Sequence, residues 1–272
     1  EILRVAGGLT NDELAEAFSQ WNAGLLASFL VEVTSNIFRV KDEETGAHLV
    51  DLVLDKAGQK GTVKWTAQVA LDLGVAVPTI AAAIDARVMS SLKAERVKAS
   101  AKLGGPHPAP AIEKVKLIAD VHDALYASKV CSYAQGMSLI GAGSRAWKWG
   151  IDLGEMARIW KGGCIIRAGF LDSIRKAYAR DGALPNLLVD DEFVAAIVAS
   201  QSGWRRTVAL ALSAGIAIPA MSASLAYFDA YRSARVPANL VQAQRDYFGS
   251  HTYERVDKPE LGFVHTDWKS KV

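Results

Sequence analysis

Gly74-Val75-Ala76-Val77-Pro78 is followed 141 residues later by Gly215-Ile216-Ala217-Ile218-Pro219. Both stretches end in proline, which suits the first residue of a helix because its missing N–H would be unpaired there anyway. At the same offset, two further pairs of segments match, namely Val69-Ala70-Leu71 with Leu210-Ala211-Leu212 and Phe29-Leu30 with Phe170-Leu171. Several short matches in the same order predict a duplicated helical unit.

Other stretches of the chain also carry helical signals. Thr10-x-x-Glu13 is a capping box ahead of an apolar pattern. Apolar residues at helical spacing from Ile112 to Leu125 predict a long helix that ends near Gly141, and 239–248 predicts one amphipathic helix. No strand-length window alternates between apolar and polar residues. The sequence therefore predicts an all-α fold of duplicated multi-helix units with an extended C-terminal tail, divided into domains 1–236 and 237–272.

The segment Thr207–Phe228 contains no charged residue and could be mistaken for a membrane span. Gly215 and Pro219 interrupt it, and it is rich in Ala and Ser rather than in Leu and Ile. Because it also belongs to the second copy of the repeat, we expect a buried helix pair and no membrane contact.

The composition is that of a globular protein. Half of the 272 residues are hydrophobic, 22% are charged and the net charge is +2, which excludes disorder and gives no charge-based reason to expect nucleic acid. Cys131 and Cys164 form neither a disulfide framework nor a metal pattern, and we expect two buried thiols. The histidines share no metal-ligand spacing, so no metal is expected. No signal peptide is visible at Glu1, and we expect a cytoplasmic protein.

Two parts of the sequence could bind an anion, and a third formally matches a nucleotide-binding motif. Gly58-Gln59-Lys60-Gly61-Thr62 precedes a helix expected to start near Lys64, and a lysine, a hydroxyl and free backbone N–H groups there suit a phosphate. An ordinary glycine-containing loop before a helix is the alternative. Arg87 borders the apolar face of the helix that begins at Pro78, where it could also be merely solvated. Gly141-Ala142-Gly143-Ser144-Arg145-Ala146 matches a dinucleotide fingerprint, but we reject it as a helix C-cap because no strand precedes it.

The stretch Gln244–Glu254 places Arg245 and His251 around a turn at Gly249, among aromatic residues. The tail that follows holds two large apolar side chains, Phe263 and Trp268, and predicts no core of its own. Such a tail is either disordered or ordered by docking on another surface, and the aromatic residues favour docking.

Taken together, these motifs resemble the C-terminal half of the 6-phosphogluconate dehydrogenases. The resemblance rests on Lys60-Gly61-Thr62, on Arg87, on the segment Lys161–Arg167 and on the Arg245–His251 stretch, which occur in the same order and spacing as in that family. It covers nearly the whole chain. One departure is Val63, where the family usually has a second glycine.

The resemblance implies a function and a set of site residues. Members of the family oxidise 6-phosphogluconate with NADP and release carbon dioxide, giving ribulose 5-phosphate in the pentose phosphate pathway. By resemblance, Lys60, Thr62 and Arg87 would hold the substrate phosphate, and Arg245 and His251 would reach the same site from the tail of a partner subunit. The family's catalytic lysine and glutamate and its NADP-binding domain are expected upstream of Glu1, so no catalytic or cofactor-binding residue is assigned in this chain.

Three interpretations stay open at this point. The chain could be the substrate-binding and dimerisation half of a competent dehydrogenase, or a catalytically inactive helical module that dimerises and binds sugar phosphates. It could also be an unrelated helical scaffold, in which case the shared motifs would be scattered in space.

Overall fold

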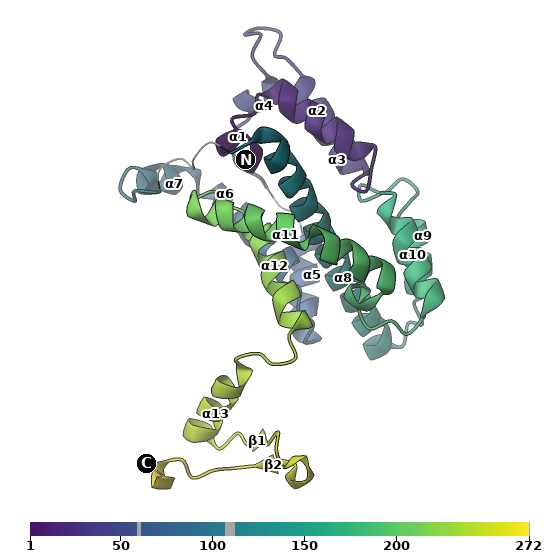
Figure 1. The fold of residues 1–272 in the computed structure, drawn as a ribbon, viewed down its shortest axis with the longest axis vertical. Helices are drawn as coiled ribbons and strands as arrows, with labels where there is room; N and C mark the ends of the chain where they lie inside the picture. The colour runs from purple at the N-terminus through teal and green to yellow at the C-terminus, as the bar shows by residue number, and fades with distance from the viewer. Residues whose placement is uncertain (59–60, 107–111, 272) are drawn as a thin grey trace. The chain divides into compact units, whose positions relative to one another are not determined.

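The structure is a computed structural model that describes residues 1–58, 61–106 and 112–271. It forms two compact units, Glu1–Tyr227 and Phe228–Val272. The larger unit is built mainly from helices, as Figure 1 shows, and the one sheet among the described residues has two short strands in the second unit. The predicted all-α fold is confirmed. The predicted division at residues 236 and 237 stays a prediction.

The first part of the larger unit is a series of short and medium helices. They are α1 (Ile2–Val5), α2 (Asn11–Asn22), α3 (Phe29–Arg39), α4 (Leu49–Leu52), α5 (Gly61–Asp72), α6 (Pro78–Ser91) and α7 (Lys93–Ser100). The predicted capping box opens α2, because Thr10 Oγ1 accepts from the Glu13 amide at 3.2 Å and the Thr10 amide donates to the Glu13 carboxylate at 2.7 Å. Helices α2 and α3 pack against each other.

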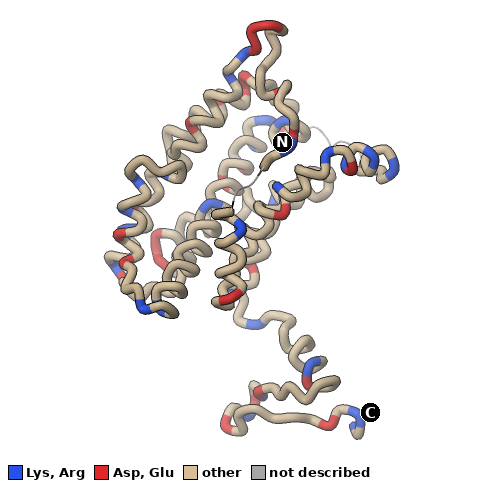
Figure 2. Tube along the Cα trace, turned by 180° about the vertical axis from the view of Figure 1, so that it is seen from behind, with Lys and Arg blue, Asp and Glu red and all other residues tan. Residues whose placement is uncertain are grey.

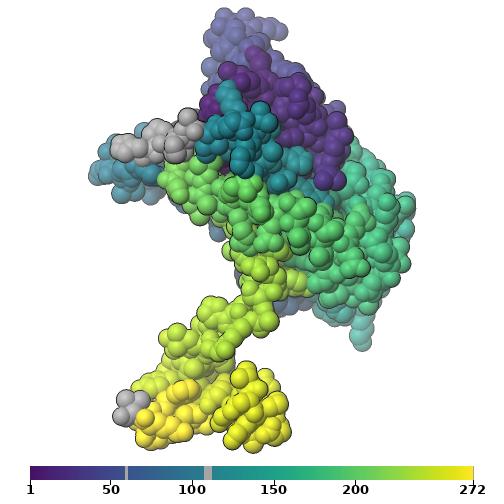
Figure 3. Space-filling model, viewed as in Figure 1, coloured from purple at the N-terminus to yellow at the C-terminus, as the bar shows by residue number. Residues whose placement is uncertain are grey.

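The core is organised by one long helix. It is α8 (Lys114–Trp147). The elements that follow it are α9 (Leu153–Ile159), α10 (Phe170–Arg180), a 3₁₀ turn (Leu187–Val189), α11 (Asp191–Ser213), α12 (Pro219–Arg232), α13 (Ala238–Gly249), β1 (Tyr253–Glu254), a 3₁₀ turn (Pro259–Leu261), β2 (Phe263–Val264) and a 3₁₀ turn (Lys269–Lys271). Helix α8 packs along α11 (Figure 3), and Trp204 of α11 is fully buried.

The predicted repeat is visible in the helix boundaries. Helix α3 covers Phe29–Arg39 and α10 covers Phe170–Arg180, which are the same positions 141 residues apart. Helices α6 and α12 are related in the same way, because Pro78–Ser91 and Pro219–Arg232 have equal length and both begin at the proline of the repeat. The duplication seen in the sequence is therefore a duplication of structure.

The repeated glycines make the same turn in both copies. Gly74 has φ +64° and Gly215 has φ +67°, a region where a side chain is disfavoured. In each copy the next residue closes the turn on the end of the preceding helix. The Val75 amide donates to the Ala70 carbonyl, and in the second copy the Ile216 amide donates to the Ala211 carbonyl, both at 2.8 Å.

A buried polar network holds the start of α6 against α8. The Thr79 amide has no partner inside its helix, and it donates to Gln135 Oε1 at 3.0 Å. Gln135 Nε2 donates back to Thr79 Oγ1 at 2.8 Å, and Thr79 Oγ1 lies 2.9 Å from Ser224 Oγ of α12. Gln135 and Ser224 are fully buried, so these bonds satisfy groups that water cannot reach.

Two sequence interpretations need correction. Helix α8 continues past Gly141 to Trp147 and ends at Lys148, which has φ 56°. The stretch 141–146 therefore lies inside the helix and is not its C-cap, because the glycines there keep ordinary helical backbone. The rejection of a dinucleotide fingerprint stands, since no strand precedes this stretch in the described chain.

The uncharged segment 207–228 contains the end of α11 and the start of α12, with the Gly215 turn between them. Among the helices the structure describes, none is long and apolar enough to cross a membrane. Basic and acidic residues are interspersed along the chain, as the colouring of the trace in Figure 2 shows.

The cysteines differ in burial. Cys131 is fully buried, and burial raises the pKa of its thiol to about 12. Cys164 is only half-buried, which corrects the expectation of two buried thiols. The reason is that Cys164 lies in the loop between α9 and α10 and not in a helix. Both thiols are free.

Candidate functional site

The first predicted group lies in the larger unit. Thr62 stands in the first turn of α5, which begins at Gly61, three residues earlier than expected. Its side chain is exposed. Val63 is already helical, so its side chain fits the backbone where the family usually has glycine. Lys60 lies outside the described residues.

Arg87 is placed two turns into α6, and its side chain is exposed. Among the described residues, its guanidinium has no hydrogen-bond or ion-pair partner. The turn that carries Arg87 is tied to the segment before the Lys60 loop by one serine. Ser90 Oγ donates to the Arg87 carbonyl at 2.7 Å and accepts from the Ala57 amide at 2.9 Å. The chain therefore reaches the loop at residue 58 beside the turn of Arg87.

A second anchor holds the same segment. The Asp55 carboxylate lies 2.5 Å from Lys93 Nζ and 3.0 Å from Arg96 Nη2, and the same Arg96 nitrogen donates to the Asp55 carbonyl. The hydrogen bonds from Lys93 and then Arg96 lower the pKa of Asp55 to about 2. The segment that ends at residue 58 is thus fixed to α7 as well as to α6.

The second predicted group lies in the smaller unit. Arg245 is exposed on α13, and its Nη1 donates to Gln242 Oε1 at 3.0 Å. His251 is exposed just after that helix, with its ring edge-on to Phe248 at a centroid distance of 6.3 Å. A side chain at Gly249 would come within 2.6 Å of the His251 ring, so only glycine allows this close approach.

The residue next to Arg245 in the sequence is a buried aspartate. Asp246, in the last turn of α13, has no exposed surface. Its Oδ1 accepts from the Thr252 amide and lies near His265 Nδ1, both at 2.9 Å. Its Oδ2 accepts from the Thr266 amide at 3.0 Å and from Trp268 Nε1 at 2.8 Å. The tail therefore has a small polar core of its own, contrary to the expectation from its sequence.

The electrostatics of Asp246 follow from this geometry. Burial alone would raise the pKa of Asp246, but the hydrogen bonds from His265, Thr266, Trp268 and Thr252 outweigh burial and hold that pKa well below its usual range. The carboxylate is therefore charged at any ordinary pH. No sequence pattern marked Asp246, because its partners come from residues up to 22 positions later.

The segment Lys161–Arg167 has structural contacts in the larger unit. Lys161 Nζ pairs with Asp172 at 2.7 Å, and the Arg167 guanidinium lies 3.6 Å from the centroid of the Phe29 ring. The Phe29 amide donates to the Arg167 carbonyl, which joins the starts of α3 and α10. These contacts give the segment a structural role, because they join the two copies of the repeat.

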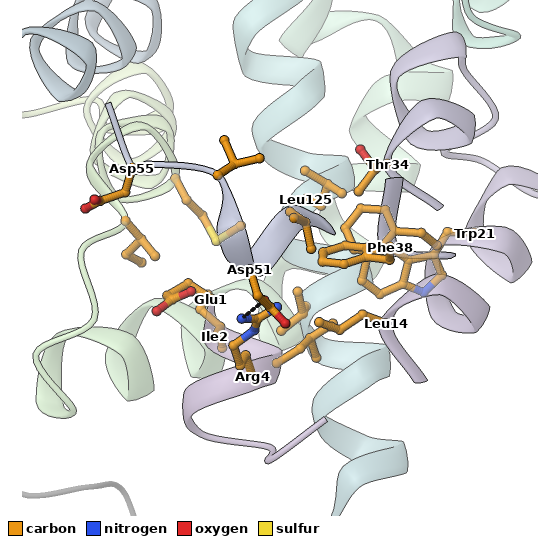
Figure 4. A pocket seen from close by; sticks show the side chains of 17 residues that line it. Glu1, Ile2, Arg4, Leu14, Trp21, Thr34, Phe38, Asp51, Asp55 and Leu125 are labelled. Carbon is orange, nitrogen blue, oxygen red and sulfur yellow. Dashed lines mark hydrogen bonds and ion pairs between the residues drawn. The ribbon is translucent and has the colours of Figure 1, made fainter. Parts of the chain in front are cut away.

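A pocket of about 810 Å³ lies elsewhere in the larger unit, where Figure 4 shows the side chains that line it. Its walls are mainly apolar, and Arg4 pairs with Asp51 at 2.8 Å on its lining. Neither Thr62 nor Arg87 lines this pocket. Thr62 and Arg87 are therefore on open surface and not in this pocket.

The described residues do not fit a dinucleotide or a metal. A dinucleotide site needs a strand, a glycine-rich turn and a helix in succession, and the described strands are two-residue segments in the tail. Within residues 1–58, 61–106 and 112–271, no three His, Cys, Asp or Glu side chains are grouped so that they could hold a metal ion.

Comparison with known proteins accounts for this arrangement. Residues 1–268 match the family described as the 6-phosphogluconate dehydrogenase C-terminal domain. The chain belongs to the 6-phosphogluconate dehydrogenase family. The resemblance inferred from the motifs is confirmed.

Individual relatives agree with the family. The chain is 58% identical over 269 residues to the decarboxylating 6-phosphogluconate dehydrogenase 1 of Oryza sativa subsp. japonica, covering 98% of this chain and 56% of that protein. A decarboxylating 6-phosphogluconate dehydrogenase of Synechocystis is 56% identical with the same two coverages. The chain thus spans about half the length of the curated relatives it matches.

A solved structure shows the same fold. The 6-phosphogluconate dehydrogenase of Plasmodium falciparum superposes with a TM-score of 0.93 at 45% identity, covering 98% of this chain and 57% of that one. That protein was solved in its apo form, with its cofactor NADP+ and with its substrate 6-phosphogluconate. The similarity extends over both described units of this chain.

Proposed function

We propose that this chain is the substrate-binding and dimerisation half of an NADP-dependent, decarboxylating 6-phosphogluconate dehydrogenase. The observation that carries the proposal is the family match over residues 1–268. The cytoplasm is the proposed compartment, and the conversion of 6-phosphogluconate to ribulose 5-phosphate is the proposed reaction of the whole enzyme.

The proposed roles follow from the chemistry of the side chains. Arg87 has no described partner and its exposed guanidinium is free to form two parallel charge-assisted bonds to a phosphate. Thr62 adds a hydroxyl at a helix N-terminus, where anions are favoured. Lys60, outside the described residues, would contribute a point charge. NADP would supply hydride acceptance, and the residues described here do not form its site.

Arg245 and His251 are proposed to complete the phosphate site from the tail of a second copy. If Lys60 and Arg87 converge with Arg245 of a second copy, as proposed, the three cations would need an anion between them, which would favour a ligand over a structural role. Exposed apolar side chains support an interface in each unit, among them Trp65 and Phe248, which are 64% and 73% exposed.

The proposed homodimer should bury more than about 2,000 Å² in total, the size of obligate interfaces. Phe263, 72% exposed, is the tail residue proposed to pack on the partner. Trp268 is proposed to do the same, and within its own unit its ring lies tilted to that of Tyr253 at a centroid distance of 5.8 Å. Removal of residues 251–272 should weaken dimerisation or substrate binding, which sedimentation and calorimetry would measure.

Titration of the chain with 6-phosphogluconate tests the site. Loss of one charge-assisted bond costs about 1.5–3 kcal/mol, so Arg245→Ala should weaken binding at least about tenfold. Arg255→Ala is the matched control, because Arg255 is an exposed arginine of the same unit that pairs with Asp257 at 2.6 Å. Equal affinities of wild type and Arg245→Ala would refute the proposed site.

Activity of the isolated chain tests whether catalysis resides in these 272 residues. Hydride transfer to NADP by these 272 residues alone is expected to be undetectable, because the described residues lack a dinucleotide-binding unit. Binding of 6-phosphogluconate without turnover would agree with a substrate-binding half. Reduction of NADP by the isolated chain would contradict this assignment of catalysis to residues outside it.

A further inference from the structure

The tail is organised by one buried charge rather than by an apolar core. Phe248 and Phe263 are more than 70% exposed, so burial of these rings within the unit does not order it. Asp246, by contrast, is fully buried, and four nitrogen atoms surround it at 2.8–3.0 Å. Each carboxylate oxygen has two of these partners, which leaves no unsatisfied acceptor.

The bond between Asp246 and Thr252 joins the sequence neighbours of the two proposed phosphate-binding residues, Arg245 and His251. Asp246 directly follows Arg245, and its partner Thr252 directly follows His251. The carboxylate therefore joins the two ends of the loop that carries His251. Gln242 makes a parallel closure, because its Oε1 accepts from Arg245 while its Nε2 donates to the Thr252 carbonyl.

The loop backbone needs such a constraint. Ser250 has φ +49° and Thr252 has φ +60°, left-handed conformations that non-glycine residues adopt only when their surroundings fix them. His251 lies between them, against Gly249. Asp246 accepts from the Thr252 amide and Gln242 donates to the Thr252 carbonyl, so loss of the Asp246 bond removes one of the two side-chain bonds that hold this backbone. The direction of the neighbouring His251 ring should change with it.

We infer that Asp246 is a positioning residue for the proposed phosphate site, and that its carboxylate fixes Arg245 and His251 relative to each other. The inference rests on the proposed function. Asp246 itself is fully buried and does not touch the ligand. Its effect on binding passes through the loop 247–252 and not through direct contact.

Calorimetric titration of the 272-residue chain with 6-phosphogluconate tests the inference. Asp246→Asn keeps the shape but turns an amide N–H toward nitrogen donors, and affinity should fall about tenfold, as for loss of a charge-assisted bond. Asp257→Asn is the control, because Asp257 is an exposed tail carboxylate paired with Arg255. The affinity of Asp257→Asn for 6-phosphogluconate should stay within about twofold of the wild-type affinity, since surface ion pairs contribute little.

A double-mutant cycle separates positioning from general destabilisation. If Asp246 acts through Arg245, the change Asp246→Asn should weaken binding much less in an Arg245→Ala background than in wild type. If the two losses simply multiply, the inference is overturned. Hydrogen exchange of the Thr252 amide should accelerate in Asp246→Asn but not in the control, while helix content stays constant.

A second variant covers the case in which Asp246→Asn loses the folded tail. Trp268→Phe removes one donor and keeps an aromatic ring beside Tyr253. It should weaken binding about threefold, with a smaller rise in exchange at Thr252. Unchanged affinity in both variants, while Arg245→Ala still weakens binding, would overturn the inference alone. If wild type itself does not bind 6-phosphogluconate, the proposed function fails and the inference fails with it.

Discussion

Replacement of Lys129 by methionine should stabilise the protein at neutral pH. Lys129 lies on α8, and its Nζ is buried with no hydrogen-bond partner among the described residues. The Phe170 ring, 5.5 Å away, is the group that faces the ammonium. Burial lowers the pKa of Lys129 to about 8 from an ordinary 10.5. A buried ammonium without a partner is unfavourable, so its removal should be a gain.

The magnitude follows from the size of the pKa shift. About 1.4 kcal/mol per pKa unit gives a penalty of about 3 kcal/mol at pH 7. Loss of the contact between the ammonium and the Phe170 ring offsets about 0.5–1 kcal/mol of this. Methionine is unbranched and of similar length, so it can fill the same space. The free energy of unfolding should therefore rise by about 2–3 kcal/mol.

The gain should depend on pH with a fixed sign. Because the folded-state pKa of Lys129 is depressed, the penalty is fully present below pH 8 and declines as pH rises toward 10.5. Cys131 acts in the opposite direction above pH 9, since its pKa is raised to about 12 and the folded state keeps its proton. Cys131 is present in both proteins, so its contribution cancels in their difference.

Urea unfolding of wild type and Lys129→Met at pH 7 and pH 9 measures both effects. The advantage of the variant should shrink by about 1 kcal/mol between these pH values. Lys176→Met, which removes an exposed lysine of α10, is the control and should change stability by less than about 0.5 kcal/mol. A Lys129→Met protein that is no more stable than wild type, or whose advantage is the same at both pH values, would refute the reasoning.

The other predictions concern the duplicated unit and can be checked by the same unfolding measurements. Gln135→Ala should cost about 1–3 kcal/mol, because the Thr79 amide and hydroxyl lose their buried partner; a loss below about 0.5 kcal/mol would mean that water replaces the side chain. Gly74→Ala should cost about 1 kcal/mol from its positive φ alone, since nothing lies within 4 Å of the added carbon. Gly215→Ala should cost more, because the added carbon would lie 2.8 Å from Pro106; equal costs would contradict that contact.

Local features of the fold could be predicted because they depend on neighbouring residues. The capping box at Thr10, the helix start at Pro78 and the repeated glycine turns are set by hydrogen bonds and backbone preferences within a few positions. The end of α8 could not be predicted in this way. Glycines at 141 and 143 indicate a helix end by themselves, but both are buried and α8 continues through them to Trp147.

The candidate site divides along the same line. The sequence by itself determined the family, the duplicated helices and the types of residue that could bind a phosphate, because motif spacing and periodicity depend only on the order of residues along the chain. Only the tertiary structure decided that Ser90 ties Ala57 to the turn of Arg87, that Asp246 is the buried centre of the tail and that the Lys129 ammonium is buried. The physical reason is that the cost of a buried charge and the partners that offset it depend on which distant segments cover it, and no local pattern specifies that.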